Sequence, residues 1–213
     1  VAQTGTGKTA AYLLPILNKL SEGGHPADAI NCIVMAPTRE LAQQIDQQME
    51  GFSYFMSVSS VAVYGGNDGI LFEQQKRGLT LGADVVIATP GRLIAHLSLG
   101  YVDLSRVSYF ILDEADRMLD MGFIHDIKRI LPLLPRKRQS LFFSATMPPE
   151  IERLAGTILH EPEKVEVTPV SSTVDTIDQS VYFVEKVEKI NLLKNLLEDR
   201  SLESVLVFTL SLI

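Results

Sequence analysis

Residues 2–9 read AQTGTGKT and residues 109–116 read YFILDEAD, and these two stretches decide the fold. The first is a turn rich in Gly and Thr that comes just ahead of a helical pattern. The second is an apolar run that passes directly into acidic residues. A glycine loop before a helix and a strand that ends in an acid together indicate a nucleotide-binding α/β fold.

The loop at 2–9 has the residue types that a phosphate-binding loop needs. Its glycines let backbone N–H groups wrap a phosphate, its lysine reaches the β- and γ-phosphates, and its last hydroxyl binds Mg²⁺. The predicted nucleotide-binding residues are Thr4, Gly5, Thr6, Gly7, Lys8 and Thr9. Because Ala2 stands where the general pattern has its first glycine, a plain turn before an ordinary helix stays open as an alternative.

The acids after the apolar run fit the metal side of such a site. Asp113 is placed to hold Mg²⁺ through water, with Thr9 as the second metal-binding residue, and Glu114 is placed to orient or deprotonate the attacking water. The alternative is an acidic helix start, which the helix dipole favours. The two stretches together predict ATP and Mg²⁺ as cofactors.

Short β-rich runs alternate with helical patterns along the chain. Strands are predicted at 32–36, 60–64, 84–88, 108–112 and 140–143, and helices at 8–20, 39–52, 69–78, 92–99, 124–134 and 150–158. Near-continuous apolar strands are typical of a parallel sheet covered on both faces. We therefore predict a doubly wound, mostly parallel sheet, whose ligand sites lie at the carboxyl ends of the strands.

Four more loops follow predicted strands and belong to the same edge. Ser144 and Thr146 can relay hydrogen bonds from a nucleotide site, although Ser and Thr before a helix are usually caps. The other three loops offer backbone amides and arginines, which suit phosphodiester oxygens, although turn chemistry alone explains any one of them. Their candidate nucleic-acid-binding residues are Pro37, Thr38, Arg39, Gly65, Gly66, Thr89, Pro90, Gly91 and Arg92.

The composition limits how the protein could bind nucleic acid and in which compartment it is expected. The 213 residues carry a net charge of −7, which argues against a broad basic face that binds nucleic acid by charge alone. A local groove of a few arginines and amides remains compatible with that charge. The single cysteine, Cys32, lies in an apolar run and is expected in the core. With no apolar stretch near the length of a membrane span, we expect a cytoplasmic protein without membrane contact.

A stretch at 170–175, beside Pro162 and Pro169, is rich in Ser, Thr and Val and has no helical period, which is typical of a linker. We predict one domain at 1–168, a linker at 169–177, and an incomplete second α/β unit at 178–213 with a strand at 178–184, a helix at 189–197 and a strand at 204–208. The phosphate loop normally follows a strand, and none precedes it here. We therefore interpret the chain as a fragment whose first strand is missing.

The motifs, taken in order, resemble the DEAD-box family of ATP-dependent RNA helicases. The resemblance rests on AQTGTGKT at 2–9, PTRELAQQI at 37–45, GG at 65–66, TPGRL at 89–93, LDEADRMLDMGF at 112–123 and FFSATMP at 142–148. It implies a RecA-like P-loop domain at 1–168 and the start of a second RecA-like domain at 178–213. Ala2 is then the family's usual residue.

The resemblance also implies a role for each motif. Lys8 would bind phosphates, Thr9 and Asp113 would hold Mg²⁺, and Glu114 would activate water. Asp116, Ser144 and Thr146 would couple the nucleotide site to domain closure on RNA. The residues implied in contacts with the RNA backbone are Thr38, Arg39, Gly66, Thr89, Gly91 and Arg92.

The activity implied is ATP hydrolysis that unwinds or remodels RNA duplexes, by a monomer with little sequence preference. Two alternatives stay open: an ATP-timed RNA clamp that barely unwinds, and a P-loop ATPase that does not act on nucleic acid. The family's adenine-reading segment and the arginine fingers of the second domain are outside these 213 residues. Since an arginine finger contributes about 10³–10⁵ in rate, we expect residues 1–213 alone to turn over little ATP.

Overall fold

The computed structural model describes residues 1, 6–66, 69–167, 178, 180–199 and 201–209. By its internal contacts the chain divides into two compact units, Val1–Pro169 and Val170–Ile213. In the part of the chain so described, no helix combines the length and the apolar character that crossing a membrane requires.

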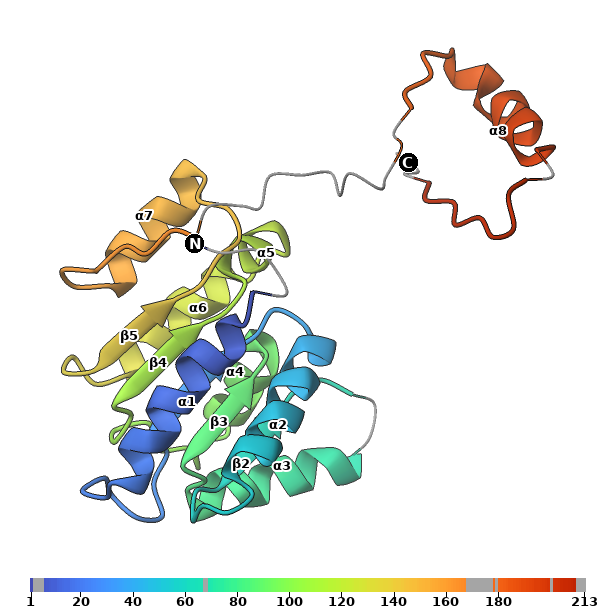
Figure 1. Ribbon diagram of the computed structural model, residues 1–213. Helices are drawn as coiled ribbons and strands as arrows, with labels where there is room; N and C mark the ends of the chain where they lie inside the picture. Colours follow the sequence, from blue (N-terminus) through green and yellow to red (C-terminus); the bar gives the residue numbers. More distant parts are fainter. Residues whose placement is uncertain (2–5, 67–68, 168–177, 179, 200, 210–213) are drawn as a thin grey trace. The chain divides into compact units, whose positions relative to one another are not determined.

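The first unit is built on a five-stranded sheet in the order β2-β3-β1-β4-β5 (Figure 1). Every neighbouring pair is parallel and in direct register. The strands are β1 (Cys32–Met35), β2 (Ser60–Val63), β3 (Val85–Ala88), β4 (Tyr109–Leu112) and β5 (Gln139–Phe142). All four residues of β1 and of β3 are buried, as expected for central strands of a sheet covered on both faces. The predicted parallel sheet is confirmed.

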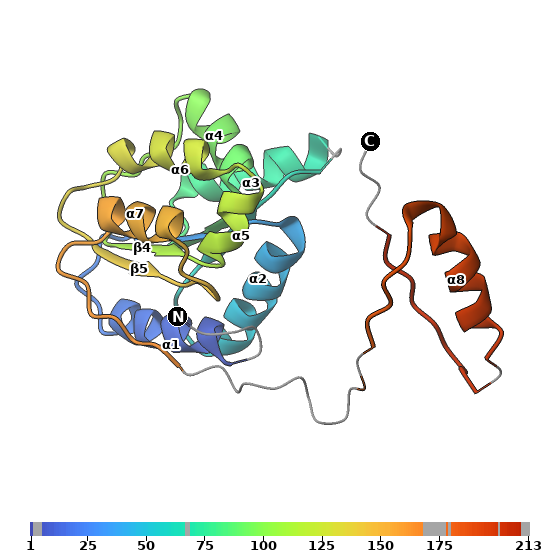
Figure 2. The same ribbon diagram turned by 90° about the horizontal axis from the view of Figure 1, so that it is seen from above.

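Helices cover both faces of this sheet. Figure 2 shows α1 and α2 on one face and the other helices of the unit on the opposite face. The bounds are α1 (Lys8–Ser21), α2 (Arg39–Ser53), α3 (Gly69–Leu81), α4 (Pro90–Ser98), α5 (Ala115–Asp120), α6 (Ile124–Ile130) and α7 (Pro149–Ile158). Each layer encloses its own apolar core, with Leu13, Ile45 and Val34 in one and Phe110, Leu93 and Ile151 in the other. The doubly wound architecture is therefore confirmed.

The helices differ from the prediction at several ends, most of them by one to three residues, and in one added helix. Helix α4 begins at Pro90 rather than at 92, because a proline fits the first helical position and Thr89 stands as N-cap. The predicted helix at 124–134 is α6 followed by a 3₁₀ turn, η1 (Leu131–Leu133), since Pro132 cannot continue the α-helix. Helix α5 was not predicted, and it ends just before Gly122, whose φ of 77° is left-handed.

Among its described residues, the second unit contains the predicted helix and neither predicted strand. Helix α8 (Lys189–Leu197) follows the 3₁₀ turn η2 (Lys186–Glu188). The described residues within 178–184 and 204–208 form no strand, so these two predictions are wrong for this structure. A strand needs a neighbour for its backbone and cover for its apolar face, yet Phe183 is 98% exposed and Phe208 is 87% exposed.

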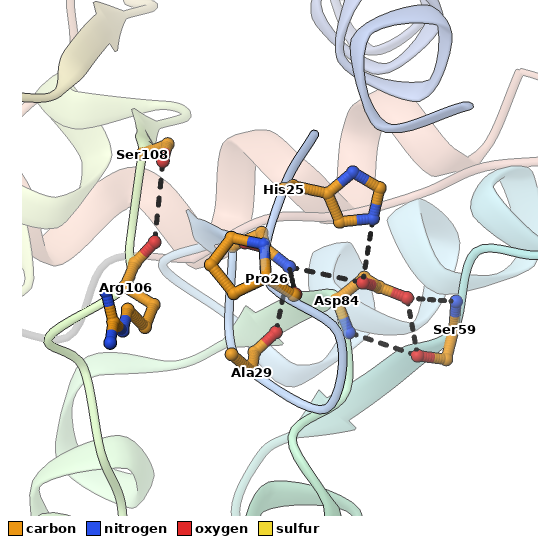
Figure 3. A network of polar contacts seen from close by, with 8 residues as sticks. His25, Pro26, Ala29, Ser59, Asp84, Arg106 and Ser108 are labelled. Atoms are coloured by element: carbon orange, nitrogen blue, oxygen red, sulfur yellow. Dashed lines mark hydrogen bonds and ion pairs between the residues drawn. The ribbon is translucent and has the colours of Figure 1, made fainter. Parts of the chain in front are cut away.

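Asp84 joins the amino ends of three strands, at the edge of the sheet away from the candidate site. Figure 3 shows its carboxylate between His25 and Ser59. Oδ2 accepts hydrogen bonds from the Ser59 amide (2.9 Å) and hydroxyl (2.8 Å), and Oδ1 accepts one from Nδ2 of Asn31 (3.2 Å). Nε2 of His25 lies 3.6 Å from Oδ1. One side chain therefore ties the starts of β1, β2 and β3 together.

Replacing Asp84 with alanine should lower the free energy of unfolding by about 1.5–3 kcal/mol, because several donors lose a charged acceptor. Urea unfolding followed by circular dichroism measures this. The matched control is Asp103→Ala, whose exposed carboxylate interacts locally with Ser105, including a hydrogen bond from the Ser105 amide (2.8 Å). Equal losses for the two variants would contradict a stapling role for Asp84.

Candidate functional site

The segments that follow the five strands lie side by side at the carboxyl edge of the sheet. Backbone hydrogen bonds continue the ladder into them, from Ala36 to Ala88, Thr89 to Val63, Asp113 to Met35 and Phe143 to Leu112 (2.8–3.0 Å). The predicted site residues that the structure describes therefore occupy one edge, as the alternation of strands and helices indicated.

The phosphate-loop end of α1 is described from Thr6 onward, and the predicted residues Thr4 and Gly5 lie outside the described residues. Gly7 is the N-cap of α1 with φ 79° and ψ 17°, a left-handed conformation that glycine adopts without steric cost. Lys8 and Thr9 form the first turn of α1 and are half-buried. The turn thus presents the start of a helix, whose free N–H groups favour anions.

Asp113 is the most buried acid of the site, at 2% exposure. Its Oδ1 accepts a hydrogen bond from the Glu114 amide (2.9 Å), and its Oδ2 accepts one from the Tyr12 hydroxyl (3.0 Å). Burial raises the pKa of this carboxyl, while the Tyr12 hydrogen bond and the positive charge of Lys8 oppose the rise. The charge of Lys8 therefore acts directly on the predicted metal-binding acid.

Glu114 has a strained backbone at the start of α5. It is the N-cap of that helix with φ 50° and ψ 52°, a left-handed conformation that costs a non-glycine residue about 1–2 kcal/mol. Its side chain is 17% exposed, and Oε2 lies 3.4 Å from Nη1 of Arg117. Such strain persists where the surroundings fix the backbone, and it concentrates at functional sites.

Asp116, Ser144 and Thr146 form one hydrogen-bonded group across two loops. Asp116 Oδ2 accepts from both the amide and the hydroxyl of Thr146 (2.9 Å each), and the Ser144 hydroxyl accepts from the Asp116 amide (3.2 Å) and donates to the Thr146 carbonyl (2.7 Å). Burial alone would raise the pKa of Asp116, but these hydrogen bonds outweigh it and lower the pKa. Helix α7 has Pro148 as its N-cap, so the capping alternative for Thr146 is wrong.

The three loops predicted to bind nucleic acid also meet. Arg92 donates from Nε to the Tyr64 carbonyl (3.0 Å) and from Nη2 to the Gly66 carbonyl (3.2 Å). The Arg39 guanidinium lies over the Tyr64 ring, 5.3 Å from its centroid. The Thr38 hydroxyl caps α2 by accepting from the Leu41 amide (3.2 Å). The side chains of Arg92 and Thr38 therefore form hydrogen bonds with the protein's own backbone in this structure. The sequence did not predict these contacts.

The remaining residues of this set differ in exposure. Gly65 and Gly91 are exposed, while Thr89 is half-buried. Pro37 and Pro90 are buried, so any part they have in binding is through the shape of their loops.

A buried polar chain behind the Tyr64 loop was missed by the sequence analysis. Gln75 donates to the Tyr64 carbonyl (3.0 Å), and its Oε1 lies 3.1 Å from Nε2 of His96. Nδ1 of His96 contacts the Tyr101 hydroxyl, and its ring stacks on Phe72 at 4.2 Å between centroids. Burial, helped by the charge of Arg92, lowers the pKa of His96 to about 4, so the ring is neutral near pH 7. No motif marks these residues, because their contacts join α3 to α4.

Tyr12 is a second residue of the site that the sequence analysis did not predict, although its position in the sequence pointed to it. It lies four residues after Lys8, which places both on one side of α1. An aromatic residue at that position is easily taken for core alone.

The oxygen donors of Thr9 and Asp113 fit Mg²⁺. The described residues contain no group of three or more His, Cys, Asp or Glu that could hold a metal ion. Mg²⁺ does not need one, since it commonly binds one or two protein oxygens together with phosphates and water.

Comparison with known sequences gives relatives along almost the whole chain. A DEAD-box ATP-dependent RNA helicase, CshA of Geobacillus kaustophilus, is 42% identical over 97% of the chain. The ATP-dependent RNA helicase DeaD of Escherichia coli (strain K12) is 41% identical over 98%. The chain spans only 43% and 32% of the length of these two proteins.

Solved structures agree with the fold. The yeast DEAD-box splicing factor Prp28 matches with a TM-score of 0.69 and 34% identity, over 75% of this chain and 39% of its own. A hypothetical ATP-dependent RNA helicase from Sulfolobus tokodaii matches with a TM-score of 0.66 and 39% identity, over 76% of this chain and 45% of its own. The family model for DEAD/DEAH box helicases matches residues 1–154. The RecA-like sheet, the clustered motifs and this match agree, and the chain belongs to the DEAD/DEAH box helicase family.

Proposed function

We propose that the complete protein is an ATP-dependent RNA helicase that hydrolyses ATP to unwind or remodel RNA duplexes. One observation carries the proposal: two groups of predicted residues lie on one edge of a single sheet. We call the residues predicted to bind ATP and Mg²⁺ and to activate water the nucleotide set, and those predicted to bind nucleic acid the nucleic-acid set. Family membership and relatives named as ATP-dependent RNA helicases support the same activity.

The residues of the nucleotide set have three different roles. The start of α1 with Thr4, Gly5, Thr6, Gly7 and Lys8 binds phosphates, since free N–H groups and a lysine favour anions. Thr9 and Asp113 hold Mg²⁺, which supplies charge neutralisation at the phosphates when bound. Glu114 orients or deprotonates the attacking water from a fixed backbone position.

The nucleic-acid set binds the RNA backbone through amides and a few arginines. An exposed Arg39 beside the Tyr64–Gly66 loop gives a local cationic surface on a chain of net charge −7. Contacts of this kind position RNA without reading sequence. The residues proposed are Pro37, Thr38, Arg39, Gly65, Gly66, Thr89, Pro90, Gly91 and Arg92.

Asp116, Ser144 and Thr146 are proposed to couple the two sets. Their hydrogen bonds join the loop after β4, which carries Asp113 and Glu114, to the loop after β5. A change at one loop therefore shifts the other. We also propose that residues 178–213 are the start of a second RecA-like domain, which follows a linker at 169–177.

Strand displacement by the full-length protein tests the function. We expect release of the short strand of an RNA duplex to require hydrolysable ATP. RNA-dependent ATP hydrolysis without any strand release would select an ATP-timed RNA clamp instead. ATP hydrolysis that ignores RNA would overturn both.

A further inference from the structure

Tyr12 places a hydroxyl between two elements of the nucleotide site. It lies on α1 with no exposed surface, and its hydroxyl donates to Oδ2 of Asp113 at 3.0 Å, across 101 positions of sequence. The other oxygen of that carboxylate accepts from the Glu114 amide. Both oxygens of Asp113 are therefore held, one by its own loop and one by the helix that follows the phosphate loop.

Thr9 lies three residues before Tyr12 on the same side of α1. Burial raises the pKa of Tyr12, and the nearby Thr9 side chain opposes that rise. A tyrosine has one O–H proton, and an ionised carboxylate can only accept. With that proton on Asp113, a hydrogen bond between the Tyr12 and Thr9 hydroxyls has Thr9 as its donor, which leaves the lone pairs of the Thr9 oxygen for a cation.

Packing fixes the tyrosine ring independently of its hydroxyl. The ring lies 5.1 Å from that of Phe143, centroid to centroid, with 49° between the planes. It also belongs to the core between α1, α2 and the sheet. A phenylalanine at position 12 would fill the same space, so the hydroxyl is not needed for the core.

We propose that Tyr12 is a positioning residue that holds the Mg²⁺-binding carboxylate of Asp113 against α1, the helix that carries Thr9, and thereby sets the Mg²⁺ dependence of nucleotide binding. This role rests on the proposed ATP-binding function. The role proposed for Tyr12 is indirect, because its hydroxyl acts through the carboxylate of Asp113.

The test is Tyr12→Phe in the full-length protein, with binding of a fluorescent non-hydrolysable ATP analogue measured across Mg²⁺ concentrations and in EDTA. We expect the half-saturating Mg²⁺ concentration to rise about tenfold, as for loss of a hydrogen bond to a charged group, with affinity in EDTA unchanged. Tyr109→Phe, at the other end of β4 from Asp113, is the matched control and should change neither quantity.

A second measurement needs no ligand. In urea unfolding with EDTA, the shift in midpoint caused by Tyr12→Phe should vanish when Asp113 is already alanine, because the hydroxyl then has lost its acceptor. Normal nucleotide binding by the wild type with an unchanged Mg²⁺ dependence in Tyr12→Phe would overturn the role of Tyr12 alone. A wild type that binds no nucleotide at any Mg²⁺ concentration would overturn the proposed function as well.

Discussion

Replacing Glu114 with glutamine should lower the kcat for ATP hydrolysis by about 10²–10⁴-fold, the range that general acid–base catalysis contributes. The amide has the size of the carboxylate but cannot take up a proton. Because the Glu114 backbone is fixed between Asp113 and α5, the substitution should leave the loop in place. Steady-state phosphate release measures kcat, and binding of a non-hydrolysable ATP analogue should stay within about twofold.

The control for this prediction is Glu152→Gln in the first turn of α7. It removes a carboxylate that also stands at a helix start but away from the nucleotide set. If Glu114 served only the helix dipole, the two variants would behave alike, since that interaction contributes about 0.3–1 kcal/mol to stability and nothing to turnover. A kcat for Glu114→Gln within a few-fold of wild type would exclude the general-base role.

Gly82→Ala should lower the free energy of unfolding by about 2–5 kcal/mol, the largest loss of stability that we expect from adding a single methyl group. Gly82 leads from α3 to β3 with φ 75°, where a Cβ carries a penalty of about 1–2 kcal/mol. The added Cβ would also lie 2.1 Å from the Asp28 carbonyl oxygen, and backbone cannot rotate away as a side chain can. Relieving that overlap costs about 1–3 kcal/mol more.

Gly100→Ala separates the two causes. Gly100 has φ 79°, yet an added Cβ there would meet no described atom within 4 Å. Its loss in urea unfolding should stay near the conformational penalty alone, about 1–2 kcal/mol. Equal losses at the two glycines would show that the contact with Asp28 relaxes freely.

Periodicity and strand-end chemistry were enough to predict the sheet. Runs such as 32–35 and 85–88 are short and apolar at every position, as expected for strands buried on both faces. Helix α5 was not predicted because its six residues make too few turns to show a hydrophobic period. The runs at 178–184 and 204–208 have strand-like patterns without strands, since a pattern cannot supply the partner that a strand requires.

The candidate site was predictable where a residue type carries its chemistry locally. Lys8 after a glycine loop and Asp113 after an apolar strand are of this kind. Contacts made across the fold were not predictable: nothing in the sequence indicated that the Arg92 guanidinium donates to the Tyr64 and Gly66 carbonyls. The sequence alone suggests that Tyr12 is a core residue. The structure shows that its hydroxyl donates a hydrogen bond to Asp113.

Coupling between the nucleotide site and the nucleic-acid site can be measured as the rate of ATP hydrolysis by the full-length protein at increasing RNA concentration. If the nucleotide and nucleic-acid sets at the carboxyl edge act as one site, hydrolysis rises with RNA and saturates, and Glu114→Gln abolishes the rise while RNA still binds. A rate that stays the same at every RNA concentration would contradict the account.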